Sequence, residues 1–364
     1  MKILYITTIG STMDFFEHLI PKLTSAGHTV DIACNTHLAP VSDYFSQLGC
    51  KIFSLDCTRT PFNKGNITAL KQISKLAENY DLVHCHTPIA SACTRIACRK
   101  LRKKGLKVFY TAHGFHFFDG APIKNWLLYY PVEWLCAHWT DVLITMNSED
   151  YRRAQTFAAK KVEYVPGVGI QIERFQNLKV DRAKVLAEFG FSPDDFVFIN
   201  IGELSVRKNQ EVAIRALAKL NTPHIKLLIV GKGPLKEKLE LLIQELHLEH
   251  QVILAGFRND IPKLLTASDA FVFPSIHEGL PVALMEAMAA GKPVVCSKIR
   301  GNVDLIEHEK GGLLAQWDDV NAFADGMKKI ILGELISPET TNQNVVKEHS
   351  TKNVNTKMLE IYGF

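Results

Sequence analysis

Apolar runs of strand length alternate with helix-like segments along almost the whole chain. In the first half, strand patterns at residues 2–7, 28–34, 51–55, 82–86 and 107–111 alternate with helix patterns at residues 15–25, 66–79 and 89–103. Two strands that are joined through a helix lie parallel in one sheet, and the helix covers a face of that sheet. The alternation therefore predicts an α/β fold with a doubly wound, Rossmann-like parallel sheet.

A second series of the same kind follows the turn-rich segment at residues 164–169. Its strand patterns occupy residues 196–201, 226–230, 252–255, 270–273 and 293–296. A chain of 364 residues is longer than one hydrophobic core usually organises. We therefore predict two facing domains, at residues 1–165 and 166–345, and a last segment, 346–364, whose helix crosses back to the first domain. Open parallel sheets bind ligands beyond the carboxyl ends of their strands, so we expect the active site in a cleft between the domains.

The composition favours a cytoplasmic protein with reduced cysteines. Hydrophobic residues make up 47% of the chain, and its first residues enter a strand pattern without the features of a signal peptide. The aromatic-rich stretch at residues 126–139 is too short and too interrupted for a membrane span. The eight cysteines form no Cys-x-x-Cys pair. His84, Cys85 and His86 alternate between the faces of a strand, so we expect no metal site there.

Basic residues are concentrated in the first half of the chain. Residues 1–165 contain 19 Lys and Arg against 13 Asp and Glu, whereas the remainder contains 23 against 25. These basic residues could contact anionic lipid. Alternatively, they could interact with the negative end of a helix dipole and keep that face of the helix in contact with water. Both interpretations stay open for the cluster at the end of the third predicted helix, which comprises Arg95, Arg99, Lys100, Arg102, Lys103, Lys104 and Lys107.

The segment after the fourth strand of the second series carries the strongest chemical signal. It reads Pro-Ser-Ile-His-Glu-Gly-Leu-Pro at residues 274–281, and an apolar helix pattern that contains Glu286 comes next. Gly279 lets the loop backbone approach a ligand, Pro281 suits a first helical turn, and the free amides of a helix start attract phosphate. These residues predict an anion site. Taken singly, Glu278 and Glu286 are equally consistent with a buried network or a solvated surface.

A second candidate phosphate loop follows the first strand of the second series. It begins with Gly202 and brings Arg207 and Lys208 to the start of the next predicted helix. Cations beside free helix amides favour phosphate binding, whereas solvated surface cations are the simpler interpretation. In the first half, Gly10 and His113 each follow a strand, although a lone histidine at a strand end is more often structural. No full Gly-x-Gly-x-x-Gly fingerprint accompanies Gly10.

Aromatic residues are unusually dense after His113. They include Phe115, Phe117, Trp126 and Trp134. A lipid-linked acceptor could dock on such a surface. The same residues could instead form the apolar stripe of a packed helix, and both interpretations stay open.

The segment from Glu278 to Glu286 resembles the Glu-x7-Glu signature of family 4 of the retaining glycosyltransferases, which have the GT-B fold of two facing Rossmann-like domains. The resemblance spans essentially the whole chain and is strongest from Gly202 to Val295. It implies that Glu286 binds the ribose hydroxyls of a nucleotide-sugar donor and that Glu278 reaches hydroxyls of the transferred sugar. The loop that holds the sugar and the diphosphate would comprise Gly279, Leu280 and Pro281.

The resemblance also implies roles for the loop that starts at Gly202. Lys208 matches the lysine that holds the donor diphosphate in this family. Where the family typically has an arginine after the glycine, this chain has Glu203, so we expect Arg207 to supply the second positive charge. We expect Lys208, Glu278 and His113 to be the catalytic residues.

The remaining expected donor contacts lie in three other loops. The family uses a glycine loop at the position of Gly10 near the donor diphosphate, and a histidine at the position of His113 against the donor sugar. Loops at the positions of Gly231 and Gly256 surround the base. Backbone groups near Phe257 and Arg258 are expected to recognise that base, which we expect to be uracil.

The resemblance implies retaining transfer of a hexose or N-acetylhexosamine from a nucleotide-sugar, expected to be a UDP-sugar, to a saccharide acceptor in bacterial surface polysaccharide biosynthesis. We expect a polyprenyl-diphosphate-linked acceptor, no cofactor, no metal requirement, no nucleic-acid partner and a peripheral contact with the inner face of the cell membrane. Two alternatives stay open. One is a GT-B sugar-nucleotide 2-epimerase, and the other is a non-catalytic partner subunit that binds a sugar nucleotide.

Overall fold

The computed structural model describes residues 1–176, 178–335 and 338–364. The chain divides into two compact units, one formed by Met1–Gly169 together with Lys352–Phe364 and the other by Ile170–Thr351. The chain thus leaves the first unit within the turn-rich segment where the sequence suggests the join, and its last residues return to that unit. Within the described ranges, no helix has the length and apolar character needed to cross a bilayer.

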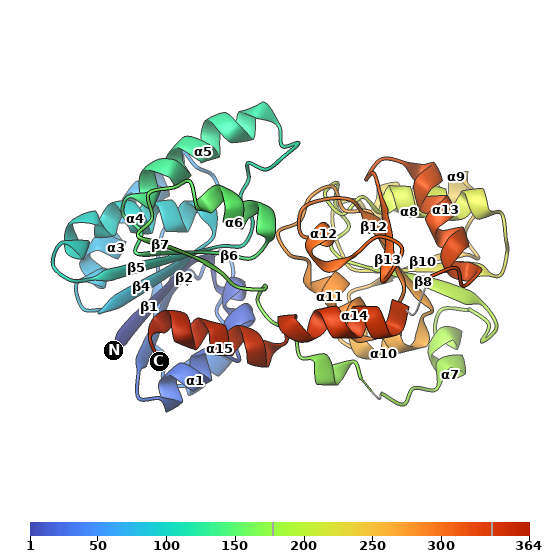
Figure 1. Ribbon diagram of the computed structural model, residues 1–364, viewed down its shortest axis with the longest axis horizontal. Helices are drawn as coiled ribbons and strands as arrows, with labels where there is room; N and C mark the ends of the chain where they lie inside the picture. Colours follow the sequence, from blue (N-terminus) through green and yellow to red (C-terminus); the bar gives the residue numbers. More distant parts are fainter. Residues whose placement is uncertain (177, 336–337) are drawn as a thin grey trace. The chain divides into compact units, whose positions relative to one another are not determined.

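The first unit contains a seven-stranded parallel sheet (Figure 1). Its strands lie in the order β3-β2-β1-β4-β5-β6-β7, so the chain starts in the middle and winds outward to both edges. This arrangement confirms the doubly wound sheet that the alternation predicts. The sequence analysis missed β6 and β7, which have four residues each and, in the case of β7, only partial burial. The strands are β1 (Lys2–Ile9), β2 (Thr29–Asn35), β3 (Ile52–Ser54), β4 (Leu82–His86), β5 (Lys107–Ala112), β6 (Val142–Thr145) and β7 (Lys161–Tyr164).

Helices cover both faces of this sheet, and Figure 1 shows α3, α4 and α5 on one face and α1 and α15 on the other. Two separate clusters of buried apolar residues fill the layers between the sheet and its helices. The helical segments are η1 (Gly10–Phe16), α1 (Ile20–Ser25), α2 (Asp43–Gln47), α3 (Lys64–Ala77), α4 (Pro88–Arg102), α5 (Ile123–Ala137), α6 (Ser148–Ala154) and α15 (Thr351–Tyr362).

The prediction of one helix over residues 15–25 is wrong at its start. A 3-10 turn, η1, ends at Phe16, and the α-helix begins only at Ile20. Pro21 explains the break, because its nitrogen carries no hydrogen to donate into a preceding turn, whereas the first turn of a helix tolerates it.

The last helix, α15, is tied to the first sheet by buried hydrogen bonds. The hydroxyl of Tyr362 lies 2.5 Å from the hydroxyl of Tyr5 and 2.6 Å from Nδ1 of His84. The other nitrogen of His84 lies 2.7 Å from the hydroxyl of Thr111. Burial, with the charge of His113 acting in the same direction, lowers the pKa of His84 to about 3, so this histidine is a neutral structural residue.

Two expectations about surface residues of the first unit need correction. Arg95 does not belong to the basic surface cluster, because its side chain is fully buried and forms an ion pair with Glu133. Arg102 is paired with Asp141 at 2.8 Å.

The aromatic residues after His113 divide between the two interpretations. Trp126 packs against the buried apolar cluster, as core packing requires, whereas Trp134 is 47% exposed.

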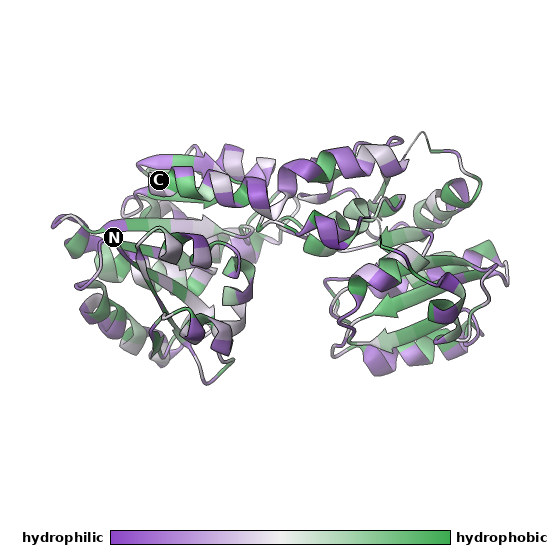
Figure 2. Cartoon of the chain, turned by 90° about the horizontal axis from the view of Figure 1, so that it is seen from below, coloured by the Kyte–Doolittle hydropathy of each residue, from purple (hydrophilic) through white to green (hydrophobic). Residues whose placement is uncertain are grey.

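The second unit contains a six-stranded parallel sheet in the order β10-β9-β8-β11-β12-β13. Figure 2 shows its strands in the colour of hydrophobic residues, as expected for strands that are covered on both faces. The sequence analysis missed β13, which has four residues. The strands are β8 (Phe196–Ile201), β9 (Ile225–Val230), β10 (Val252–Gly256), β11 (Ala270–Phe273), β12 (Val294–Ser297) and β13 (Gly312–Ala315).

Two apolar clusters again lie between this sheet and its helices. The helical segments are η2 (Ile172–Arg174), α7 (Arg182–Ala187), α8 (Gln210–Leu220), α9 (Lys236–Glu245), α10 (Ile261–Ala267), α11 (Val282–Ala289), α12 (Asn302–Leu305), α13 (Val320–Ile331), α14 (Pro338–Val346) and η3 (Lys347–His349).

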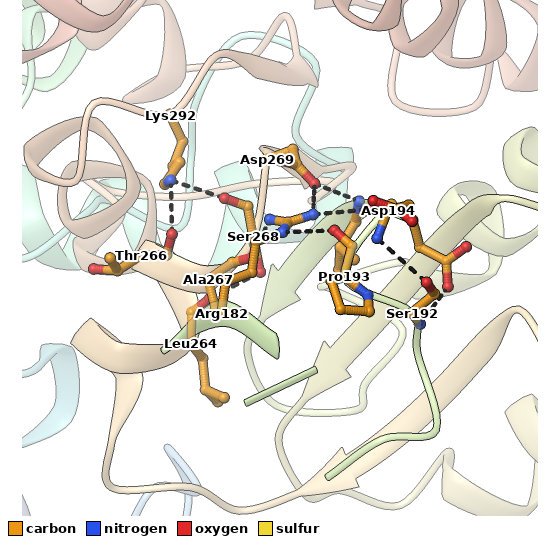
Figure 3. Close-up of polar contacts among 12 residues, drawn as sticks. Arg182, Ser192, Pro193, Asp194, Leu264, Thr266, Ala267, Ser268, Asp269 and Lys292 are labelled. Atoms are coloured by element: carbon orange, nitrogen blue, oxygen red, sulfur yellow. Dashed lines mark hydrogen bonds and ion pairs between the residues drawn. The ribbon is translucent and has the colours of Figure 1, made fainter. Parts of the chain in front are cut away.

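A network of hydrogen bonds and an ion pair lies at the amino-terminal edge of the second sheet (Figure 3). Arg182 in α7 donates to the carbonyl oxygens of Pro193, at 3.2 Å, and Asp195, at 2.6 Å. It also lies 2.8 Å from the carboxylate of Asp269, which accepts the backbone N–H of Val197 at the start of β8. These contacts hold α7 to the starts of β8 and β11. The network therefore stabilises the edge opposite to the one where ligands of such sheets bind.

Candidate active site

Glu278 is the centre of a buried ion-pair cluster at the carboxyl edge of the second sheet. Lys208 Nζ donates to Glu278 Oε1 at 2.7 Å, and Arg207 Nη1 lies 2.8 Å from Oε2. The side chain of Glu278 is only 8% exposed. Both cations come from the loop after β8, whereas Glu278 comes from the loop after the neighbouring strand β11. The structure therefore brings together three residues that the sequence analysis selected from two separate motifs.

The charges in this cluster keep one another ionised. Burial by itself would raise the pKa of Glu278, but the charges of Lys208 and Arg207 outweigh burial and hold this pKa below its usual value. Burial lowers the pKa of Lys208, and the charge of Glu278 opposes that change. Glu278 faces two cations, Lys208 and Arg207, and such a pair of cations suits the binding of a diphosphate, although the charge of Glu203 also acts on Lys208.

The side chain of Lys208 packs against Gly202 and Phe273. A Cβ atom on Gly202 would lie 3.2 Å from Cδ and Cε of Lys208, so the glycine leaves room for the lysine stem. The ammonium group lies 4.6 Å from the centroid of the Phe273 ring. Asn209 follows in the left-handed conformation, with φ of 55°, and its side chain donates to Pro274 O at 3.1 Å. This loop is therefore held against the end of β11.

Glu203 and Arg207 occupy different environments in this loop. Glu203, which stands where the family typically has an arginine, is exposed. Arg207 instead approaches Glu278, and its carbonyl oxygen accepts the backbone N–H of Ile276 at 2.8 Å. The geometry is thus consistent with Arg207 as the second cation beside Lys208.

The loop after Glu278 leads directly into α11. Pro281 is the N-cap, in an extended conformation with φ of −79° and ψ of 116°, and Leu280 packs against the core. The first amides of a helix have no partner within it, so the start of α11 can serve as an anion site. Arg300, which the sequence analysis did not select, donates from Nε to Glu278 O at 3.0 Å and fixes this loop.

Glu286 lies a little over one turn into α11, which begins at Val282. Burial raises the pKa of Glu286 to about 7, and the charge of Arg174 opposes this change. The charged form of a carboxyl group with a raised pKa is stabilised when hydroxyl groups donate hydrogen bonds to it. Glu286 is therefore suited to accept hydrogen bonds from a ligand.

Phe257 and Arg258 follow β10, and their side chains differ in exposure and in their contacts within the protein. The Phe257 side chain is 67% exposed, and Lys232 Nζ lies 5.9 Å from its ring centroid. Arg258 is held by two carboxylates, those of Asp260 at 2.7 Å and Glu188 at 2.9 Å. The phenyl ring is therefore open to stacking with a base, whereas the guanidinium group is engaged within the protein.

Gly10 and His113 lie at the carboxyl edge of the first sheet, after β1 and β5. The backbone N–H of Gly10 donates to Ala39 O at 3.0 Å, and a Cβ atom there would lie 2.3 Å from the backbone of Pro40. Only glycine therefore fits this close approach. Burial lowers the pKa of His113 to about 4, so its imidazole is neutral at physiological pH. It can act there as a hydrogen-bond partner and not as a cation.

Two residues that the sequence analysis did not assign lie at the end of β4. Nδ1 of His86 lies 3.2 Å from Nε2 of His113, and Nε2 of His86 is buried without a hydrogen-bond partner in the part of the chain that the structure describes. Thr87 has a φ of 67°, which is rare for a β-branched residue, and its hydroxyl lies 2.6 Å from that of Thr8. Such strained backbone often marks functional sites. The only sequence signal was the position of both residues at a strand end.

Comparisons with known proteins identify the family and the fold of the chain. The profile of the family described as "Glycosyl transferases group 1" matches residues 181–348, and that of "Glycosyl transferase 4-like" matches residues 2–147. The chain is 36% identical over 326 residues to EpsD of Bacillus subtilis, a protein named as a glycosyltransferase, and the match covers 83% of this chain and 85% of EpsD.

Two further proteins are similar over most of their length. The UDP-Gal:alpha-D-GlcNAc-diphosphoundecaprenol alpha-1,3-galactosyltransferase of Escherichia coli is 32% identical over 279 residues, which cover 73% of this chain and 70% of that enzyme. The crystal structure of Anabaena HepE in complex with UDP superposes with a TM-score of 0.82 at 21% identity and covers 100% of both chains. The likeness to HepE concerns the fold.

The raised pKa of Glu286 predicts a pH-dependent effect of Glu286→Gln on stability. Because the pKa is about 7 in the folded chain against 4.5 for an ordinary glutamate, ionisation of Glu286 lowers the free energy of unfolding as pH rises between these values. Each tenfold change in proton affinity corresponds to about 1.4 kcal/mol, so Glu286→Gln should gain at most about 3 kcal/mol above pH 7 and little near pH 4.5. Urea titrations followed by Trp317 fluorescence, in a chain whose other three tryptophans are replaced by phenylalanine, measure this difference, because Trp317 lies in Ile170–Thr351.

The exposed Glu249 provides the control for this measurement. Glu249→Gln should leave the pH dependence of unfolding as it is in the unchanged protein. An equal effect of Glu286→Gln at both pH values would contradict the assignment of a raised pKa to Glu286.

Proposed function

The chain belongs to the group 1 glycosyltransferases and has their GT-B fold, and we propose that it is a retaining, metal-independent enzyme that moves a hexose or N-acetylhexosamine from a UDP-sugar to a lipid-linked saccharide. The observation that carries this proposal is the buried cluster of Glu278, Lys208 and Arg207 beside the start of α11. It combines two cations with helix amides, as a donor diphosphate requires.

The comparisons support the proposed donor and acceptor. The similar Escherichia coli enzyme is named for a UDP-galactose donor and a diphosphoundecaprenol-linked acceptor. HepE, which shares the fold, was crystallised with UDP-glucose as well as with UDP. The exposed ring of Phe257 suits stacking with uracil. An acceptor on a polyprenyl diphosphate would place the reaction at the inner face of the cell membrane.

In the proposed reaction the diphosphate of the donor lies against Lys208, Arg207 and the first amides of α11. These groups stabilise the negative charge that grows on UDP as the bond between the sugar C1 and the phosphate oxygen breaks. The acceptor hydroxyl forms its bond to C1 from the face that UDP leaves, and its proton passes to a phosphate oxygen of UDP. Entry and departure on the same face retain the configuration at C1.

Glu278 and Glu286 take different parts in this scheme. Glu278 Oε1 accepts from Lys208, Oε2 lies 2.8 Å from Arg207 Nη1, and each carboxylate oxygen has a further lone pair for a sugar hydroxyl. Glu286 accepts from the ribose hydroxyls. That Gly10 and the neutral His113 of the first unit contact the same donor molecule stays a prediction, as does the expected cleft.

Binding and turnover test the proposed function in two steps. UDP and the correct UDP-sugar should raise the melting temperature, since a ligand at about one hundred times its Kd stabilises the folded state by about 3 kcal/mol. Addition of a lipid-linked saccharide should then release UDP and form a product with the donor's anomeric configuration, in the presence of EDTA as well as without it.

Each alternative gives a different result in the same assay. Conversion of the UDP-sugar to an epimer without acceptor would identify a 2-epimerase. Tight UDP binding without turnover would identify a non-catalytic subunit. If no nucleotide or nucleotide-sugar shifts the melting curve, the proposed function is wrong.

The two glutamates should separate donor binding from transfer. Glu286→Ala is expected to weaken UDP binding by about tenfold, because a charged hydrogen-bond acceptor contributes about 1.5–3 kcal/mol. Glu278→Ala should bind UDP no more weakly than the unchanged protein, since Lys208 and Arg207 lose a competing carboxylate, yet it should transfer sugar at least tenfold more slowly. Calorimetry and the UDP-release assay measure these two quantities. Equal, small effects of both substitutions would contradict both roles.

A further inference from the structure

A hydrogen bond to another histidine joins His113 to the interior of the first unit. Nε2 of His113 lies 3.2 Å from Nδ1 of His86, the last residue of β4. Burial lowers the pKa of His86 well below its usual value and that of His113 to about 4, so both rings are neutral at physiological pH. A neutral imidazole has one nitrogen that carries hydrogen and one that does not. One ring must therefore donate and the other accept.

The ring of His86 is enclosed by three other rings. Its side chain is fully buried, and its centroid lies 4.2 Å from that of His84 and 4.5 Å from that of Phe16. It stacks on Tyr5 at 5.5 Å with an interplanar angle of 14°. Among the residues that the structure describes, Nε2 of His86 has no hydrogen-bond partner. The three rings hold the plane of His86 and keep its Nδ1 within hydrogen-bonding distance of His113.

His84 has hydrogen bonds of its own. Its Nδ1 lies 2.6 Å from the hydroxyl of Tyr362, and its Nε2 lies 2.7 Å from the hydroxyl of Thr111. Both of its nitrogens are thus occupied by hydroxyl groups. His84 therefore supports the ring of His86 by packing and not by a hydrogen bond.

The unpaired nitrogen of His86 indicates which ring donates. If His113 donated from Nε2, the hydrogen of His86 would lie on its own Nε2, as a buried N–H group without an acceptor. If His86 donates from Nδ1, its Nε2 carries no hydrogen, and His113 carries its hydrogen on Nδ1. Among backbone groups, buried N–H groups without an acceptor are rarer than acceptors that lack a donor. The same order, applied to the ring, favours donation by His86.

We propose that His86 is a positioning residue for His113, and that it donates from Nδ1 to Nε2 of His113 and so fixes both the ring and its tautomer. The hydrogen bond that one imidazole nitrogen makes decides which nitrogen carries the hydrogen. Within the described ranges, Nδ1 of His113 has no hydrogen-bond partner in the protein. Its N–H group then serves as a fixed donor to an oxygen of the donor sugar. This role rests on the proposed function, whereas the tautomer of His113 does not.

Nitrogen NMR of the full chain without ligand reads the tautomer directly. With isotope-labelled histidine, and with His113→Asn to assign the signals, Nε2 of His113 should show the shift of a nitrogen without hydrogen. In His86→Phe, which keeps a ring among its neighbours but has no donor, both tautomers of His113 should be populated. Hydrogen on Nε2 of His113 in the unchanged protein, or the same tautomer in folded His86→Phe, would overturn the proposal.

Two substitutions of His86 separate the hydrogen bond from packing. The side-chain amide of an asparagine reaches the place of Nδ1 and can donate there, although it fills the space less well than a phenyl ring. The kcat for sugar transfer should fall by about tenfold or more in His86→Phe and by about threefold or less in His86→Asn. A purely structural role would give the opposite order, because phenylalanine preserves the packing better.

Tyr362→Phe is the matched control, because it removes a buried hydroxyl that bonds to His84 in the same group of rings. It should lower the free energy of unfolding and leave kcat and the tautomer of His113 unchanged. An equal loss of kcat in this control and in His86→Phe, or a lower kcat in His86→Asn than in His86→Phe, would contradict the positioning role. Calorimetry should show unchanged UDP affinity in His86→Phe, since Lys208 and Glu286 lie in the second unit. Absence of UDP binding in the unchanged protein would contradict the proposed function, and the ligand-free tautomer would still decide the role of His86.

Discussion

The buried contact of Glu278 with Lys208 and Arg207 is the interaction on which the account of this site depends. A carboxylate that is 8% exposed must be paired, and here its partners come from the loop of the neighbouring strand. The pairing holds two βα loops together and keeps two cations in place before any ligand arrives. It also places the two cations near the start of α11, where helix amides add to the same potential. Fixed charges of this kind need little rearrangement when charge develops on a leaving group.

Parallel topology explains why sequence analysis could select these residues. Every βα loop of a doubly wound sheet lies at the carboxyl edge, so motifs far apart in the chain become neighbours once the alternation of strands and helices is recognised. Lys208 and Glu278 are 70 residues apart and yet lie 2.7 Å from each other. Their direct contact could not be predicted, because it depends on side-chain packing across two loops. Arg300 was missed for the same reason, and His86 was considered only as a metal ligand, because each acts through a tertiary contact.

Errors in the sequence analysis arose where burial or a single backbone group overrides a local pattern. Arg95 lies in a run of basic residues and yet is buried and pairs with Glu133. Arg99, one turn later on the same side of α4, is exposed. The helix expected from residue 15 begins at Ile20, where Pro21 sets its first turn. The missed strands β6, β7 and β13 have four residues each, a length at which periodicity is a weak signal, although β11 and β12 of the same length were predicted.

The central claim is that Lys208, which pairs with Glu278 in the structure, holds the diphosphate of the donor. Calorimetric titration of UDP into the unchanged protein and into Lys208→Met tests it most directly, with Arg215→Met as a control because Arg215 pairs with Glu211 on the surface of α8. Loss of a charged contact to phosphate should weaken UDP binding by roughly tenfold or more in Lys208→Met, whereas Arg215→Met should bind UDP as the unchanged protein does. Equal UDP affinity in Lys208→Met and the unchanged protein, with both folded, would contradict the account.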